Sequence, residues 1–199
     1  MSTIGIPTSE RIAKRADECG AAYLRSPVTG NPAVVAAGNL GLIVSGPRDA
    51  YQAVEDVLRD IGPNHFYVGP AEQARVVKLA INLMIAGTSE LIAEALVMAE
   101  RNDIDRAQML EVMGGSVVGS PFVKYKTEAL IADDYASTFT TEGLYKDIAL
   151  ALECANAVGV PLPIGALVQQ LVQGCISQGM GDIDFMSLLP RLRREAGLT

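Results

Sequence analysis

The sequence predicts a two-part protein in which a small α/β segment is followed by an all-α domain. Short apolar runs alternate with helical patterns over residues 1–70, which is typical of α/β structure. From residue 71 onward the strand signals stop and only helical spacing continues. One apolar pattern over about residues 71–101 joins the two parts, and as an α-helix it would be about 45 Å long. We therefore expect domains at residues 1–70 and 71–199, joined by a long interdomain helix.

In the α/β segment we expect two helices and three extended runs. The first helix begins near Thr8-Ser9-Glu10 and ends at Cys19-Gly20, and the second covers about residues 50–61. The extended runs lie at residues 23–27, 42–44 and 66–68. The alternation predicts a mostly parallel sheet. Because so few strands do not make a stable open sheet, we expect the second half of a doubly wound unit, with its first half absent.

The all-α domain is expected to continue with five shorter helices after the long one. Gly, Asp and Pro residues separate them and mark their ends. The predicted helices cover about residues 105–114, 120–132, 142–158, 163–178 and 184–196.

Composition and charge exclude several function classes. The chain has 16 basic and 23 acidic residues and a net charge of −7, which argues against a nucleic-acid partner or a polybasic membrane face. Aromatic residues are 5% and Trp is absent, so base stacking is a poor candidate as well. The mean hydropathy of +0.25 is high for a chain outside the membrane and favours a homo-oligomer, either a homodimer or a homotetramer.

The few cysteines and the single histidine argue against a metal site. Cys19, Cys154 and Cys175 form no CxxC pair, and His65 has no ligand partner at a typical spacing. Free thiols are typical of a reducing compartment, and Met1-Ser2-Thr3-Ile4 does not resemble a signal peptide. We therefore expect a cytoplasmic protein without a structural metal.

Two polar residues stand out in the long helix. Between Val76 and Gly87 the pattern is apolar nearly all round, so we expect this helix to be buried on most sides. Lys78 and Asn82 are its strongly polar members, and their spacing of four residues places them on one face. Because burying an ammonium is costly, Lys78 is a candidate general acid or base in a cleft between the two halves. The alternative is that Lys78 reaches solvent while Asn82 bonds to neighbouring backbone.

Five stretches of the chain resemble, in order and approximate spacing, the motifs of the β-hydroxyacid dehydrogenases. This family includes 3-hydroxyisobutyrate dehydrogenase, tartronate semialdehyde reductase and, more distantly, 6-phosphogluconate dehydrogenase. The stretches are Ser2-Thr3-Ile4, Ser26-Pro27-Val28-Thr29-Gly30, Gly69-Pro70 with Lys78 and Asn82, Tyr145-Lys146-Asp147-Ile148, and Gly181-Asp182-Ile183-Asp184-Phe185. The resemblance implies a partial Rossmann unit followed by the family's all-α domain.

The resemblance also implies a function and a role for each matching residue. It implies hydride transfer between NAD or NADP and a small 3-hydroxy acid or semialdehyde. Lys78 would be the catalytic acid or base and Asn82 its partner. The substrate carboxylate would bind at the turn formed by Thr29, Gly30 and Asn31, and the cofactor would contact Thr3 and Lys146.

The chain departs from the family pattern at three places. Thr29 replaces the usual Ser of the substrate turn, and Asn31 replaces its second Gly. Glu72-Gln73-Ala74 replaces a Gly-x-Gly ahead of the lysine, which adds a carboxylate near the expected cleft. No Gly-x-Gly-x-x-Gly turn for the pyrophosphate occurs in the 199 residues, so we expect this chain to be a C-terminal portion that is inactive by itself.

Two other functions stay open at this point. The chain could be a non-catalytic oligomerisation or binding module, in which case Lys78 would be replaceable without effect. It could also resemble the related imine reductases, although those enzymes usually replace the lysine that this chain keeps at position 78.

Overall fold

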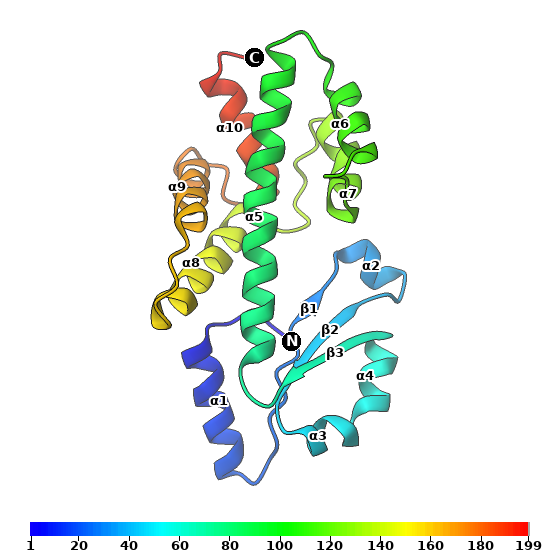
Figure 1. The fold of residues 1–199 in the computed structure, drawn as a ribbon, viewed down its shortest axis with the longest axis vertical. Coiled ribbons are helices and arrows are strands. Elements are labelled where there is room, and N and C mark those ends of the chain that lie inside the picture. The colour runs from blue at the N-terminus through cyan, green and yellow to red at the C-terminus, as the bar shows by residue number, and fades with distance from the viewer. Residues whose placement is uncertain (199) are drawn as a thin grey trace. The chain divides into compact units, whose positions relative to one another are not determined.

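The N-terminal part of the chain folds around a small three-stranded sheet (Figure 1). The computed structural model describes residues 1–198. Its strands are β1 (Val28–Thr29), β2 (Gly41–Ser45) and β3 (Asn64–Gly69), in the order β1-β2-β3. β2 runs parallel to β3 but antiparallel to β1. The parallel pairing of β2 with β3 has five registered pairs, as a mostly parallel sheet predicts, and the antiparallel pairing of the two-residue β1 has two.

The helices beside the sheet follow the local sequence signals. α1 (Ile6–Glu18) has Pro7 in its first turn and ends before Gly20, whose φ of +68° is typical of a helix C-terminus. The predicted helix over 50–61 is instead two short ones, α3 (Arg48–Ala53) and α4 (Glu55–Ile61), interrupted at Val54 with φ −119° and ψ 11°. A further short helix, α2 (Pro32–Ala36), was not expected.

The core of this region lies between the sheet and the pair α3 and α4. All five residues of β2 are buried, as the apolar run 42–44 predicted. Leu42 and Val44 form a cluster with Tyr51 of α3 and Leu58 of α4. Figure 1 shows these two helices beside β2 and β3.

The rest of the chain is helical, as predicted. The elements are α5 (Gln73–Glu100), α6 (Arg106–Gly115), α7 (Pro121–Ile131), α8 (Thr141–Ala157), α9 (Pro163–Ser177), the 3-10 helix η1 (Phe185–Ser187) and α10 (Leu188–Glu195). Side chains cap several of them: Asp105 accepts from the first turn of α6, and Ser120 from that of α7. The helix expected over 184–196 begins as η1 because Asp184 caps a tighter first turn.

The described chain forms two compact units, each made of two stretches. The first unit contains residues 1–84 and 147–162, and the second contains residues 85–146 and those from 163 onward. α5 and α8 therefore each contribute to both units. The second unit has its own apolar core, whose fully buried members include Leu96, Leu110, Leu130, Leu144 and Met186.

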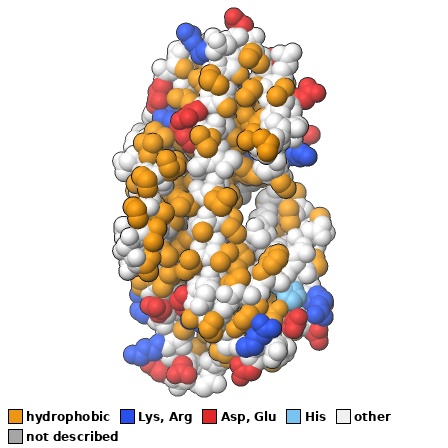
Figure 2. Space-filling view, in the orientation of Figure 1, with side chains coloured by type: hydrophobic (Ala, Val, Ile, Leu, Met, Phe, Trp, Pro, Cys, Tyr) orange, Lys and Arg blue, Asp and Glu red, His pale blue; other side chains and the backbone are white. Residues whose placement is uncertain are grey.

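One face of α5 is exposed, while the other positions of the helix are buried or half-buried. Met84, Leu91 and Met98 are 72%, 65% and 64% exposed, and they recur every seventh residue. Figure 2 shows hydrophobic side chains along α5 on the face drawn. Over residues 1–198, α5 is the one helix long and apolar enough to cross a membrane by length and composition, a test that core helices also pass.

Candidate functional site

Asn82 of α5 is held by a buried carboxylate from α8. Its side-chain Nδ2 donates a hydrogen bond of 2.6 Å to Oδ2 of Asp147. Asn82 and Asp147 are only 5% and 2% exposed. Because Nδ2 is engaged by Asp147, the orientation of the amide is fixed and its Oδ1 is the acceptor that remains.

Lys78 lies one turn before Asn82 on the same face of α5, as the spacing predicted. The residue is partly buried. The exposed row of Met84, Leu91 and Met98 lies on the other side of the helix, since α-helical positions advance by about 100° per residue. The polar pair and the exposed apolar row therefore occupy different faces of α5.

The three residues expected to bind a carboxylate lie together where β1 leads into α2. Thr29 ends β1, and Gly30 follows with φ +142°, a conformation that side chains with a Cβ rarely adopt. A Cβ on Gly30 would lie 3.0 Å from Cγ1 of Val34. Asn31 caps α2, because its Oδ1 accepts a hydrogen bond of 2.9 Å from the backbone N–H of Val34. The side-chain Oδ1 of Asn31 therefore already has a partner within the fold.

The two residues expected to contact the cofactor lie in different units. Thr3 is partly buried in the stretch before α1, in the first unit. Lys146 is exposed on α8 and belongs to the second unit. The first unit thus contains Thr3, the turn 29–31, Lys78 and Asn82, and it does not contain Lys146.

Glu72, which departs from the family pattern, is half of a buried ion pair. Its Oε1 accepts a hydrogen bond of 2.8 Å from Nε of Arg25 and a second, shorter one from the same guanidinium. The two side chains are 13% and 9% exposed. The sequence predicted a carboxylate near the site but gave no sign of this partner, which lies 47 residues earlier.

Sequence reasoning missed the roles of Asp147, Arg25 and Arg75. Asp147 was part of a recognised motif, but its bond to Asn82 joins residues 65 positions apart. The available signal was an ionisable residue inside an apolar stretch, as in Leu24-Arg25 and Arg75-Val76-Val77. That signal had drawn attention to Lys78 alone.

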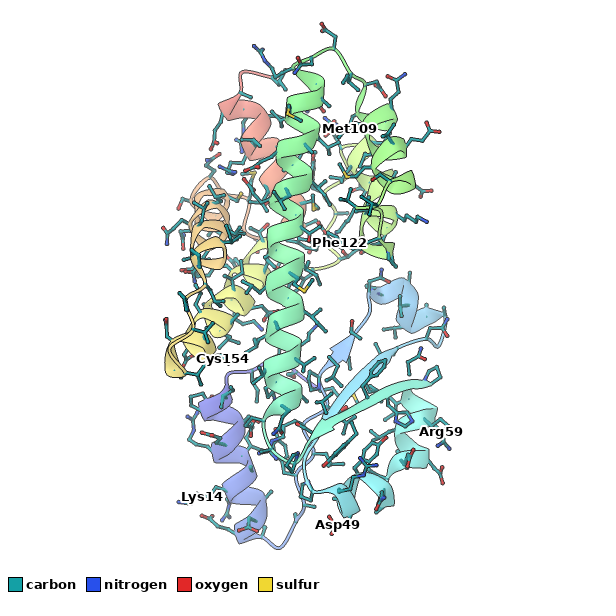
Figure 3. The ribbon with its side chains drawn as sticks, viewed as in Figure 1. Lys14, Asp49, Arg59, Met109, Phe122 and Cys154 are labelled. Carbon is teal, nitrogen blue, oxygen red and sulfur yellow. The ribbon has the colours of Figure 1, made fainter. Side chains whose placement is uncertain are left out.

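The segment Gly181–Phe185 is structural in the second unit. Both carboxylate oxygens of Asp184 accept hydrogen bonds of 2.8 Å from Nζ of Lys126. Its Oδ1 also accepts from the backbone N–H of Met186, which caps η1. The Lys126 ammonium lies 4.2 Å from the ring centroid of Phe185, and that ring stacks on Phe122, labelled in Figure 3.

A pocket of about 530 Å³ in the first unit lies beside the start of α5. Its lining residues come from α1, the end of β3 and the first turns of α5: Ile6, Glu10, Val68, Ala71, Glu72, Gln73, Val76 and Val77. Lys78 and Asn82 are not among them, so this pocket is separate from the face that carries the candidate acid or base.

Thr3 has a hydroxyl and Lys146 an ammonium, both of which can donate hydrogen bonds. A Gly-x-Gly-x-x-Gly turn, which brings backbone N–H groups to a pyrophosphate, does not occur in the sequence.

Two family models cover nearly the whole chain. The model described as the NAD-binding domain of NADP-dependent 3-hydroxyisobutyrate dehydrogenase matches residues 73–192. The model described as the NAD-binding domain of 6-phosphogluconate dehydrogenase matches residues 1–69.

Individual proteins agree with these models. The 3-hydroxyisobutyrate dehydrogenase of Pseudomonas aeruginosa is 32% identical over 177 residues, which cover 85% of this chain and 59% of that protein. The crystal structure of 3-hydroxyisobutyrate dehydrogenase from Salmonella typhimurium has a TM-score of 0.89 at 22% identity, covering 95% of this chain and 67% of that one. The Mycobacterium tuberculosis enzyme of the same name, solved with L-serine, has a TM-score of 0.84 at 24% identity, covering 96% and 68%.

The chain spans about half to two thirds of the length of the curated relatives it matches. The order of motifs, the mixed α/β fold with its many helices and both family models lead to one conclusion. The chain belongs to the β-hydroxyacid dehydrogenase family, whose matching domains are NAD- and NADP-binding.

Proposed function

We propose that this chain supplies the substrate-binding and proton-transfer residues of an NAD(P)-dependent 3-hydroxyacid dehydrogenase or reductase. The observation that carries the proposal is the buried Asn82–Asp147 hydrogen bond one turn after Lys78. An amide fixed in one orientation beside a lysine suits proton transfer at a hydroxyl or carbonyl oxygen, because that step needs its groups held in place.

In this proposal Lys78 is the general acid or base. Its ammonium donates a proton to the substrate oxygen during reduction, and its amine takes the proton back during oxidation. Oδ1 of Asn82 accepts from the ammonium or from the substrate hydroxyl, since Nδ2 is engaged by Asp147. Asp147 is then a positioning residue that acts through Asn82.

The substrate class follows from the turn after β1. Backbone N–H groups around Gly30 and the hydroxyl of Thr29 are donors that suit a carboxylate. Asn31 contributes through the backbone conformation that its cap imposes. A small 3-hydroxy acid or semialdehyde fits this donor set, and L-serine, found with the Mycobacterium tuberculosis relative, is a 3-hydroxy carboxylic acid.

NAD or NADP, when bound, supplies or accepts the hydride. Thr3 and Lys146 are the residues we propose for contact with it. The chain's own contribution is to bind the carboxylate at the turn 29–31 and to hold or release a proton at Nζ of Lys78.

We also propose the finer architecture expected from the sequence. Residues 1–70 would be the second half of a Rossmann-like NAD(P)-binding domain, and residues 71–199 the all-α domain of the family. The separate family models for residues 1–69 and 73–192 support this division. A homodimer or homotetramer is proposed from the exposed apolar row of α5, and a cytoplasmic location stays a prediction.

The carboxylate site is tested on the 199-residue chain itself. Calorimetric titration with 3-hydroxyisobutyrate is expected to give saturable binding that Thr29→Val weakens about tenfold, the cost of one charge-assisted hydrogen bond. Thr8→Val on α1 is the matched control and is expected to bind as wild type does. Titrations with NADH and NADPH, followed by fluorescence, test whether the chain binds either dinucleotide without a Gly-x-Gly-x-x-Gly turn.

Lys78 is tested by turnover in the intact enzyme, with a panel of 3-hydroxy acids and NAD or NADP. Lys78→Met is expected to lower turnover by about 10²- to 10⁴-fold, while the circular dichroism spectrum of the helices stays unchanged. Lys14→Met, on the outer side of α1 (Figure 3), is the control for loss of a surface charge. An undiminished rate in Lys78→Met would contradict the assignment of Lys78 as the general acid or base and would favour a non-catalytic binding module.

A further inference from the structure

Four buried or half-buried polar residues of the first unit connect three segments that carry the proposed site residues. They are Tyr23, Arg25, Glu72 and Arg75, called the bridging network below. None of them was assigned a role from the sequence motifs. The three segments are the N-terminal stretch with Thr3, residues 23–27 ahead of β1 and the turn 29–31, and the start of α5 with Lys78.

Arg75 connects the start of α5 to the N-terminal stretch. Its guanidinium donates to the backbone carbonyl of Ser2, the residue before Thr3, and to Oγ of Ser9 at 3.4 Å. Arg75 is only 4% exposed, and it lies one turn before Lys78 on α5. A change at Arg75 therefore acts on the position of Thr3 and on the first turns of α5 together.

Arg75 also connects α5 to residues 23–27, which lead to the substrate turn. Its Nη2 donates a hydrogen bond of 3.0 Å to the hydroxyl of Tyr23. The Tyr23 ring in turn lies under the guanidinium of Arg25, 4.7 Å from the ring centroid, and the Tyr23 carbonyl accepts from Arg25 at 3.2 Å. Tyr23 thus contacts both arginines of the network.

Arg25 and Glu72 connect residues 23–27 to the residues ahead of α5. Besides the buried ion pair, Arg25 exchanges backbone hydrogen bonds of 2.8 and 2.9 Å with Ser45 at the end of β2. The hydroxyl of Ser45 donates to the carbonyl of Ala71 at 2.7 Å and accepts from the N–H of Ala74 at 3.1 Å. Side-chain and backbone bonds therefore hold the same two segments against each other.

The energetic character of this network favours positioning over stability. Replacing a buried ion pair by apolar residues of similar volume is often neutral or stabilising, so such a pair is weak support for a stabilising role. Oε2 of Glu72 is also buried without a hydrogen-bond partner among the described residues, which is a cost. What the network does achieve is a fixed geometry, because a guanidinium bonds a carboxylate in a defined plane.

We propose that Tyr23, Arg25, Glu72 and Arg75 are positioning residues that hold Thr3, the turn 29–31 and Lys78 in register for a substrate carboxylate and its hydroxyl. The proposal rests on the proposed function for the identity of the site. The new element is that this network sets the distance between the bound carboxylate and the reacting oxygen. The network therefore sets the length of substrate that the site accepts.

The first test measures positioning without any need for activity. Amide hydrogen exchange followed by mass spectrometry is compared for wild type and Arg75→Met. Exchange in residues 2–9 and 26–31 is expected to become about tenfold faster, because the bonds that join these segments to α5 are lost. Exchange in α3 and α4 is expected to stay the same. Arg59→Met, on the outer side of α4 (Figure 3), removes an exposed arginine and is the matched control.

The second test separates positioning from simple loss of folded protein. Arg25→Met alone leaves a buried carboxylate unpaired and can prevent folding. Two double variants are therefore used. The charge-reversed pair is Arg25→Glu with Glu72→Arg, and the apolar pair is Arg25→Met with Glu72→Leu. The apolar pair is expected to fold but to raise the Kd for 3-hydroxyisobutyrate in the binding titration about tenfold. The reversed pair and the single variant Arg25→Lys each keep an ion pair, so their Kd is expected to lie between those of wild type and the apolar pair.

The outcomes distinguish this proposal from the proposed function. Unchanged exchange in residues 2–9 and 26–31 of Arg75→Met, or an apolar pair with the wild-type Kd, would overturn the positioning role. A wild-type chain that binds no carboxylate would overturn the proposed function, while the exchange measurement still decides whether the network holds the three segments.

Discussion

At the scale of single residues, Gly30 is the position where the backbone itself is specialised. Its φ of +142° is a conformation that costs other residues energy, and a Cβ there would press on Val34 at 3.0 Å. Gly30→Ala is therefore expected to lower the free energy of unfolding by about 1–3 kcal/mol. It is also expected to weaken carboxylate binding at the turn. Urea unfolding and the 3-hydroxyisobutyrate titration measure the two effects.

Gly87 is the matched control for this substitution. It lies inside α5 with open space where a Cβ would be placed. Gly87→Ala is therefore expected to leave stability unchanged or raise it by up to about 1 kcal/mol, the helix propensity difference between the two residues. If both glycine variants behaved alike, the special conformation of Gly30 would not be what the turn requires.

At the scale of secondary structure elements, a buried ion pair joins α5 to α10 in the second unit. Arg191 donates to Oε1 of Glu90 at 2.9 Å, and the two side chains are 5% and 7% exposed. Burial raises the pKa of the Glu90 carboxyl, while the Arg191 guanidinium opposes that shift. The charged form of Glu90 is therefore less favourable in the folded state than in the unfolded one.

The raised pKa gives a pH dependence of definite sign. Between the unfolded value near 4.5 and the higher folded pKa, the folded chain binds more protons than the unfolded chain. The contribution of Glu90 to stability is therefore largest below pH 4.5 and is lost as pH rises through the folded pKa. Glu90→Gln is expected to lower stability overall but to remove this decline. Urea unfolding of both proteins from pH 4.5 to 8 measures the slope, and parallel curves would contradict the role of Glu90.

The helices could be predicted from sequence because their ends are set by nearby residues. Asp105 and Ser120 cap the helices that follow them, and Gly20 ends α1. The antiparallel pairing of β1 with β2 and the interruption at Val54 could not be predicted, since strand direction depends on partners outside the strand. Short segments that pack on a sheet also follow its surface more than their own propensity.

The candidate site divides in the same way. The spacing of Lys78 and Asn82 is local, so sequence was sufficient to place both on one face of α5. The partners of Asn82 and Glu72 lie 65 and 47 residues away and are brought close only by the fold. No periodicity in a single sequence reports such pairs, and for this reason Arg25, Arg75 and Asp147 needed the structure.

At the scale of the whole molecule, the exposed apolar surface predicts self-association. Met84, Leu91 and Met98 recur at seven-residue spacing on α5, and Ile164 and Leu167 of α9 are 66% and 57% exposed. Figure 2 shows hydrophobic side chains over both helices on the face drawn. A repeat of seven residues supplies one of the two apolar positions of the heptad by which helices of two subunits pack.

Leu91→Glu is therefore expected to shift the protein from an oligomer to a monomer, because a carboxylate buried in an apolar interface without a partner costs several kcal/mol. Sedimentation equilibrium at micromolar concentration measures the mass directly. Val57→Glu on α4 is the control, since Val57 is 58% exposed and lies outside the row. A control that also dissociates would point to general charge repulsion in a chain of net charge −7. A monomeric wild type would contradict the oligomer, and the apolar face of α5 would then need another partner.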